Sequence, residues 1–206
     1  WKPWGERLVS YMTRVRSQLV TYIAGDKATD DGVMAWDRTG YPVVSKSGVF
    51  RQVILADGYA QILKTTNQTA ATADTAYALT WDDITFANGI TLDPADSTKI
   101  VFAEGGKFIV GFTAQLQSSS ANAKNIWFWP RVSGTDSDGS TIKTTLKLNG
   151  EEIVVSSSAI FEIASGQYLQ SMFAVSDVAI TITAPATTAF APDSTAATLS
   201  ITRFMQ

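Results

Sequence analysis

From residue 75 onward, short apolar-rich stretches alternate with turn residues, the pattern of an antiparallel β-sandwich or barrel. The pattern predicts nine strands, at residues 75–81, 99–103, 107–117, 125–132, 141–148, 153–163, 168–175, 178–184 and 197–204. In the third strand every second residue is expected on the core face, namely Phe108, Val110, Phe112, Ala114 and Leu116. This part of the chain is therefore predicted to be an all-β domain of two sheets.

The fourth predicted strand is apolar on both faces, because Ile126, Trp127, Phe128 and Trp129 follow one another without a polar residue. Such a strand has to be covered on both sides, either inside its own sandwich or by a neighbouring subunit. We favour a neighbouring subunit. The residues predicted for a trimer interface are Trp127, Trp129, Phe112 and Tyr77.

The N-terminal segment shows a different period. Between residues 5 and 23, apolar side chains recur at alternating steps of four and three, which predicts one amphipathic helix. The residues predicted to form an anchoring surface are Trp1, Trp4, Leu8, Met12, Val15 and Leu19. The row of apolar side chains along this helix is short, so the helix needs another surface that buries them. That surface is either the helix's own domain, or sister chains or another protein.

Between these two parts, residues 25–64 predict small strands and hairpins, and residues 65–74 contain no large apolar side chain. A segment without large apolar residues is typical of a linker. The sequence therefore predicts an N-terminal helix and β-rich anchoring region at 1–64, a linker at 65–74 and a head domain at 75–206.

Composition narrows the function. The 206 residues carry a formal charge of −3, which argues against nucleic acid as a partner, and no apolar run is long enough for a membrane span. Histidine and cysteine are both absent. Their absence excludes the usual activated nucleophiles, histidine acid–base catalysis, and zinc sites built from these ligands. We expect no enzyme activity and no cofactor.

Acidic residues are the remaining candidates for catalysis or metal binding. The pairs Asp82–Asp83, Glu151–Glu152 and Asp30–Asp31 are candidates for glycoside hydrolysis, but carboxylates at such turn positions usually face water or cap the turn. The segment that contains Asp136 and Asp138 resembles the start of a calcium loop. It lacks the later ligands of such a loop, so a plain hairpin turn is the favoured interpretation.

The order of elements in the head resembles the trimeric jelly roll of tumour-necrosis-factor ligands and of complement and collagen-like globular heads. The resemblance covers roughly residues 70–206. It rests on the aromatic strand at 77–81, the strand entry at 104–108, the Asn149–Gly150 turn and the step into a late strand at 164–169. Gln167 stands where that family usually has aspartate. The closing segment at 198–204 resembles the last strand of such domains in tailed-phage structural proteins.

The resemblance implies a jelly-roll sandwich that forms a homotrimer. With the N-terminal region leading to an anchor, the chain is expected to be a virion structural protein on the outer surface of a tailed phage, as a capsid decoration or head-fibre protein. Its partners would be other capsid or tail proteins.

A second hypothesis is a tail-fibre tip that binds a host glycan or protein through Trp81, Tyr168 or the loop at 133–140. A third, a glycan-cleaving enzyme, rests only on the carboxylate pairs.

Overall fold

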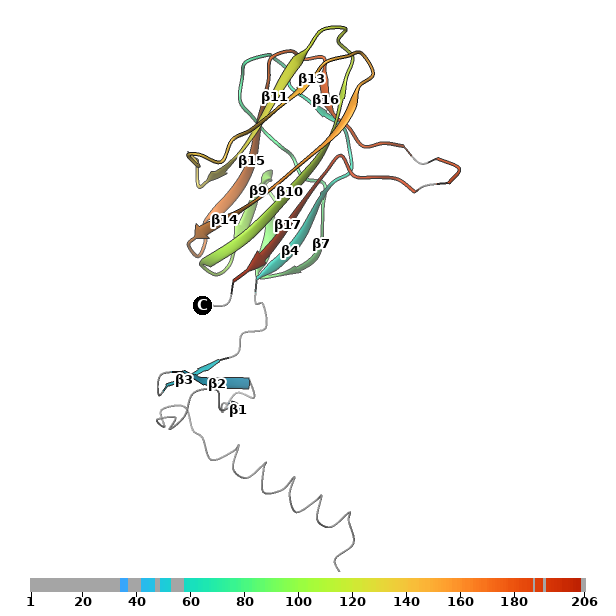
Figure 1. Cartoon of the computed structure of the whole chain (residues 1–206). Helices are drawn as coiled ribbons and strands as arrows, with labels where there is room; N and C mark the ends of the chain where they lie inside the picture. The colour runs from blue at the N-terminus through green and yellow to red at the C-terminus, as the bar shows by residue number, and fades with distance from the viewer. Residues whose placement is uncertain are drawn as a thin grey trace, which may run out of the picture. The chain divides into compact units, whose positions relative to one another are not determined.

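The computed structural model describes residues 34–36, 42–46, 49–52, 58–186, 188–190 and 192–204. The chain divides into two compact units, one up to Leu55 and one from Ala56 (Figure 1). The residues predicted for the N-terminal helix and the anchoring surface, Trp1 to Leu19, lie outside the described residues. Among the described residues, no helix has the length and apolar content needed to cross a bilayer.

The first unit contains a small antiparallel sheet in the order β1–β2–β3. Its strands are β1 (Met34–Trp36), β2 (Pro42–Lys46) and β3 (Val49–Gln52). These positions agree with the short strands that the sequence predicts in this region.

The second unit consists of two seven-stranded sheets. The first sheet has the order β5–β16–β10–β17–β4–β7, and β14 lies along the other edge of β10. Its strands are β4 (Tyr59–Lys64), β5 (Gln68–Thr69), β7 (Asp83–Asn88), β10 (Gly106–Ser118), β14 (Glu152–Ile163), β16 (Ile180–Ile182) and β17 (Ala197–Arg203).

The second sheet has the order β12–β11–β15–β9–β8, with β13 paired to β11 and β6 paired to β15. Its strands are β6 (Tyr77–Ala78), β8 (Ile90–Asp93), β9 (Asp96–Phe102), β11 (Lys124–Val132), β12 (Thr135–Asp136), β13 (Ile142–Leu146) and β15 (Tyr168–Val175). All of these pairings are antiparallel. Two curled antiparallel sheets of this kind form a jelly-roll sandwich, which agrees with the predicted all-β class.

The core lies between the two sheets and follows the predicted alternation. In β10 the five residues predicted to face inward are all buried. Aromatic rings join the layers. Phe112 packs against Phe128 of the second sheet with ring centroids 5.1 Å apart, and Phe102 meets Phe108 at 4.7 Å in an edge-on arrangement. Such contacts add to the hydrophobic gain from burying each ring.

The head begins earlier than the sequence predicts. Strand β4, which the sequence assigned to the anchoring region, pairs with β17 along residues 59–64 and with β7 on its other side. Its alternation explains the placement, because Ala60 and Ile62 are buried in the sandwich core while Tyr59 faces outward. The first strand of the sandwich therefore precedes the predicted linker.

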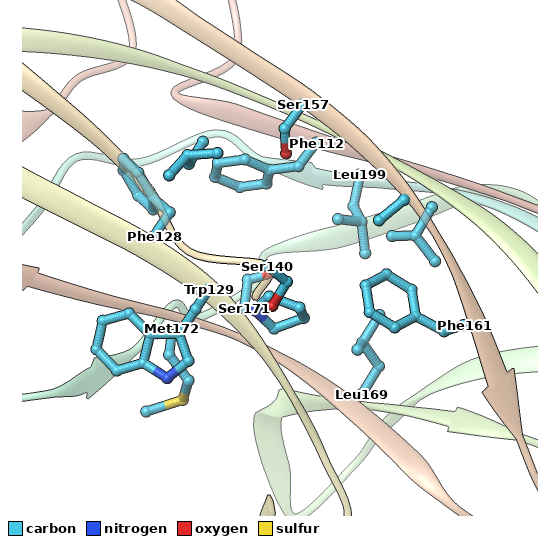
Figure 2. Close-up of a pocket in the computed structure, with 14 residues that line it drawn as sticks. Phe112, Phe128, Trp129, Ser140, Ser157, Phe161, Leu169, Ser171, Met172 and Leu199 are labelled. Atoms are coloured by element: carbon cyan, nitrogen blue, oxygen red, sulfur yellow. The ribbon is translucent and has the colours of Figure 1, made fainter. Parts of the chain in front are cut away.

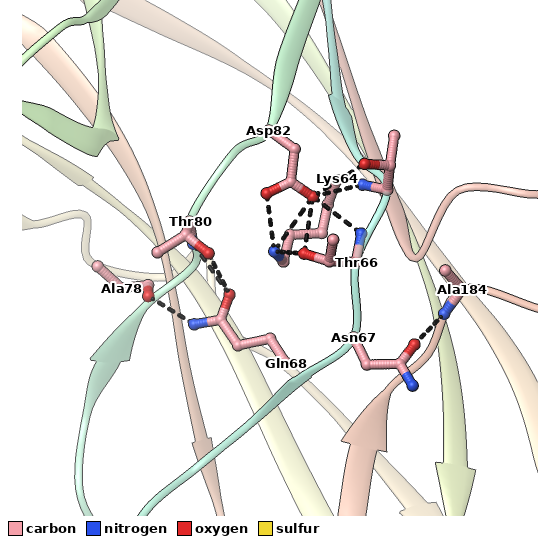
Figure 3. A network of polar contacts seen from close by, with 9 residues as sticks. Lys64, Thr66, Asn67, Gln68, Ala78, Thr80, Asp82 and Ala184 are labelled. Atoms are coloured by element: carbon pink, nitrogen blue, oxygen red, sulfur yellow. Dashed lines mark hydrogen bonds and ion pairs between the residues drawn. The ribbon is translucent and has the colours of Figure 1, made fainter.

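Part of the predicted linker is also fixed to the head, by polar side chains (Figure 3). Gln68 donates to the carbonyl of Ala78 at 3.0 Å and accepts from the backbone and hydroxyl of Thr80, each at 3.0 Å. Asn67 accepts from the amide of Ala184 at 2.7 Å. The segment was predicted to be a linker because it lacks large apolar side chains. In the structure, hydrogen bonds hold it to the head instead of apolar packing.

Candidate assembly surface

The outward face of the first sheet carries apolar side chains among small polar ones. On β14, Val154 is 63% exposed and Ile160 is 61% exposed, with Ser156 and Ser158 between them. On the neighbouring strand β10, Ile109 is 39% exposed. Isolated exposed apolar residues are common on protein surfaces, but grouped ones indicate a contact surface.

The strand register brings several of these side chains into one row. Ile109 lies opposite Ile160 on one side and opposite Thr202 of β17 on the other. Thr202 in turn lies opposite Tyr59 of β4, whose ring is also exposed. Because directly paired residues point to the same side of a sheet, these four side chains form a band across four strands. We call this band and the exposed side chains of β14 the assembly face.

Charge is confined to the ends of this face on its two longest strands. Lys107 is paired with Glu162 near one end, and Gln117 is paired with Glu152 near the other. Between those ends the outward residues of β10 and β14 are uncharged. Thr113 and Ser156 satisfy one another through a hydroxyl–hydroxyl hydrogen bond of 3.0 Å. Covering the face would therefore desolvate little charge.

An apolar groove opens at the same edge of the sandwich, between β14 and the second sheet (Figure 2). Among the described strands β14 pairs with β10 alone, so its inward side chains Ser157 and Phe161 stay partly exposed. We call this the edge groove and define it by Phe112, Phe128, Ser157, Ala159, Phe161 and Leu169. A second hollow continues it past Phe128 toward β13. The sandwich is thus left open along one side.

The predicted trimer-interface residues differ in how deeply they are buried. Phe112 is 8% exposed and belongs mainly to the chain's own core, with the small exposed part of its ring in the edge groove. Tyr77 is half-buried against Phe173, with ring centroids 5.9 Å apart. Trp127 and Trp129 are also half-buried, on the other side of β11 from Phe128. A contact between any of these residues and another copy stays a prediction.

Trp127 and Trp129 both have polar neighbours within the chain. The ammonium of Lys143 lies 5.5 Å from the ring centroid of Trp127, within the range of a cation–π interaction. The indole nitrogen of Trp129 donates to Asp136 at 2.9 Å. A strand that is apolar on both faces can therefore be covered on its outer face by charged side chains, which the sequence pattern does not reveal.

Asp136, a candidate calcium ligand, is used for structure. Arg131 donates to it through two nitrogens, and this ion pair, together with the Trp129 bond, lowers the pKa of Asp136 below its ordinary value. The described residues contain no group of three acidic, histidine or cysteine side chains placed to hold a metal. The segment that resembles a calcium loop forms a turn at 138–139. A separate two-residue hairpin just before Asp136 turns at Ser133 and Gly134, which both have positive φ, as a type I′ turn requires.

The described carboxylate pairs also have structural partners. Asp82 forms an ion pair with Lys64 at 3.1 Å and accepts from Thr65 and Thr66 (Figure 3). Burial alone would raise its pKa, but the hydrogen bonds from Thr66 and Lys64 outweigh burial and lower it to about 2. In the other pair, Glu151 caps a turn by accepting the amides of residues 147 and 148, and Glu152 accepts from Gln117. Asp30 and Asp31 lie outside the described residues.

The predicted receptor contacts differ in exposure. Trp81 is 2% exposed, so it belongs to the core and cannot reach a ligand without a structural change. Its backbone amide donates to the carbonyl of Ser97 at 3.0 Å. Tyr168 is half-buried beneath Lys99, whose ammonium lies 5.1 Å from the ring centroid. In the predicted loop at 133–140, residues 133–136 and 138–139 are exposed.

No protein-family model and no curated protein matches the sequence. Solved structures do resemble it, and one is the crystal structure of murine APRIL at pH 5.0. That similarity spans 71% of this chain and 98% of the APRIL chain, with 9% sequence identity and a TM-score of 0.46. At this level it carries no argument about function, and the strand order itself defines the sandwich.

The exposed residues Ile109, Val154 and Ile160 were not among the predicted interface residues. Each of them stands between two apolar neighbours in sequence, as Ile109 does between Phe108 and Val110. The rule applied to residues 126–129, that a strand apolar on both faces needs two covers, identifies these positions as well. The signal was therefore present in the sequence, in the smaller side chains.

Proposed function

We propose that this chain is a non-enzymatic structural protein that acts as a homotrimer on the outer surface of a tailed-phage particle. Its role would be that of a capsid decoration or head-fibre protein, with the jelly roll exposed and the N-terminal region attached to other virion proteins. The assembly face is the observation that carries the proposal. It is apolar, uncharged along its middle and next to an open sandwich edge.

The physical argument concerns what an isolated copy leaves uncovered. Strand β14 spans twelve residues and pairs on one side only among the described strands. A long edge strand with exposed apolar side chains tends to associate with other chains unless something covers it. Burying a side chain the size of isoleucine contributes about 1.5–3 kcal/mol. A closed symmetric assembly would cover the edge and the face together.

The number of copies and the virion setting have separate support. The jelly-roll fold makes a trimer plausible, and the order of a β-rich N-terminal unit followed by a head fits a protein that attaches at one end. The candidate catalytic pairs at 82–83 and 151–152 are engaged within the chain. Their carboxylates form an ion pair or accept hydrogen bonds that stabilise turns and strand ends, which favours a structural role over catalysis.

Light scattering on the purified full-length chain tests the trimer. We expect a molar mass near three times 22.2 kDa. Ile109→Lys combined with Ile160→Lys places two cations in the band of the assembly face that crosses four strands and is expected to give monomers. Leu148→Lys is the matched control, since Leu148 is 65% exposed at a turn outside the assembly face. A monomeric unmodified chain, or a double variant that stays trimeric, rejects this face.

The virion role needs a separate experiment. A chain that lacks residues 1–55 is expected to remain a trimer, with three times its own chain mass by light scattering. It is also expected to be lost from phage particles, as measured by mass spectrometry of purified particles. If the shortened chain is still incorporated, the N-terminal region is not the anchor. If neither form is found in particles, the protein is not a virion component.

Receptor binding is the second candidate. The neighbouring half-exposed indoles of Trp127 and Trp129 beside Lys143 provide the combination of aromatic and polar groups that sugars bind. A glycan array with the full-length chain tests it, with Trp127→Ala as the variant expected to lose binding. Binding that Trp127→Ala leaves intact would place the sugar elsewhere.

A further inference from the structure

The loop between β16 and β17 carries a phenylalanine, Phe190, that stands almost fully exposed in the described part of the chain. Phe190 is 91% exposed, the highest exposure among the large apolar side chains of the described residues. The loop extends away from the sandwich on the right of Figure 1. We call the described residues of this loop, 183–186, 188–190 and 192–196, the arm. A phenylalanine that stays exposed forgoes the favourable free energy that burial of its ring would contribute.

Both ends of the arm are fixed to the sheet. The backbone of Gln115 accepts from Thr183 and donates to Ala196, at 2.9 and 2.8 Å. The side-chain amide of the same glutamine donates to the carbonyl of Thr195 at 2.7 Å. The arm therefore leaves the sheet at a defined place, and a change in the fold is not needed to present Phe190.

The edge groove lies on the opposite side of β10 from the arm. Strand β14 pairs with one edge of β10 over residues 106–117, while β16 and β17, which flank the arm, share the other edge. In Figure 1 the arm projects on the right, and the lower part of β14, which lines the groove, lies on the left. The arm therefore leaves the sheet at the edge of β10 opposite to the edge where β14 lines the groove.

We infer that Phe190 of one copy inserts into the edge groove of the next copy. The groove is uncharged and lined by Phe112, Phe128 and Phe161 with the hydroxyl of Ser157 nearby (Figure 2). The arm matches it, because Asp193 is its single charged residue. The inference rests on the proposed homotrimer. A contact between different surfaces of identical copies closes into a ring when the rotation allows it.

Cysteine cross-linking tests this contact directly, because the chain contains no cysteine of its own. Ala159, which lines the groove, is changed in Ala159→Cys, and the arm is changed in Phe190→Cys. The full-length chain carrying both changes is treated with a short bifunctional maleimide and run on a denaturing gel. We expect bands at two and three times the chain mass. The same treatment of Ala159→Cys combined with Phe86→Cys is the matched control, since Phe86 is also well exposed.

The outcomes separate this contact from the trimer itself. If the double variant is trimeric by light scattering but gives no intermolecular band, or links within one chain, the arm does not occupy the groove and the trimer stands. If the chain is monomeric, both ideas fail together.

Phe190→Ala is expected to weaken association by at least ~10-fold, as loss of a buried aromatic anchor does. Phe86→Ala should leave association unchanged, and equal effects of the two variants would overturn the inference.

Discussion

Asp82→Asn is expected to destabilise the head strongly, because it removes the counter-charge of a buried ammonium. The side chain of Lys64 is 3% exposed, and its nitrogen lies 3.1 Å from the Asp82 carboxylate, whose own side chain is 25% exposed. The same carboxylate accepts the amides of Thr65 and Thr66, at 2.7 and 2.8 Å. These contacts fix the end of β4 and the segment that follows it.

The magnitude follows from the pKa of Asp82. A fall from the ordinary value of 3.8 to about 2 corresponds, at about 1.36 kcal/mol per pKa unit, to roughly 2 kcal/mol of stability. In the asparagine variant the Lys64 ammonium also loses its ion pair, and removing one partner of a buried pair costs about 3–5 kcal/mol. Since Asp82 is partly solvated, we expect a loss of about 2–4 kcal/mol at pH 7.

The pH dependence has a definite sign. The pKa of Asp82 is lower in the folded chain than in the unfolded one, so protonation favours unfolding. Its contribution is complete above about pH 4 and is lost as the pH falls toward 2. The stability of Asp82→Asn has no such dependence at this site. The gap between the two proteins should therefore be constant from pH 7 to 5 and should narrow between pH 4 and 2.

Urea unfolding followed by tryptophan fluorescence, at one fixed protein concentration, measures this gap without adding salt that would screen the charges. Asp83→Asn is the matched control, because that exposed neighbour accepts only the amide of Ile84 among the described contacts. Lys64→Met combined with Asp82→Asn should recover most of the loss, since it removes the unpaired charge. A loss below about 0.5 kcal/mol, or a gap that does not narrow in acid, refutes the reasoning.

Two further changes test the core and the hairpin turn, and both are measured by the unfolding midpoint. Phe102→Ala removes a fully buried ring from its edge contact with Phe108 and should cost about 3–5 kcal/mol; a cost below 1 kcal/mol would contradict the packing. Gly134→Val places a β-branched residue at φ +87° and should cost about 1–2 kcal/mol, whereas Ser133→Asn at φ +46° should be neutral or slightly stabilising. The reverse order would exclude the type I′ turn.

The long strands of the sandwich could be predicted from the sequence because each has enough residues to show its period. Strands β10, β11, β14 and β15 lie within a residue or two of the predicted ranges. Strand β7 was missed because it mixes polar and apolar residues without a regular alternation, and none of its six side chains is buried. An edge strand of this kind is held by its ladder of backbone hydrogen bonds, which leaves no pattern in side-chain polarity.

The polar composition of residues 65–74 also explains why the start of the head was predicted too late in the chain. Residues 65–74 were predicted to be a linker because they lack large apolar side chains, yet Gln68 and Asn67 join them to distant backbone groups. Hydrogen bonds to residues far away in sequence depend on the fold, so a local pattern cannot reveal them. Ile109 and Ile160 are less conspicuous in the sequence than Trp127, whose place in a trimer interface stays a prediction.

The assembly face and the edge groove are two consequences of one feature, the position of β14. As the outermost strand of its sheet, β14 places Val154 and Ile160 on the outward face and leaves Ser157 and Phe161 incompletely covered on the inward face. A strand at the centre of the sheet would have neighbours on both sides, and the sandwich would be closed. The chain instead keeps this edge uncharged over seven residues, Val154 to Ile160. Charge or proline at an edge is the usual protection against association, and its absence here favours a partner that covers β14 on both faces.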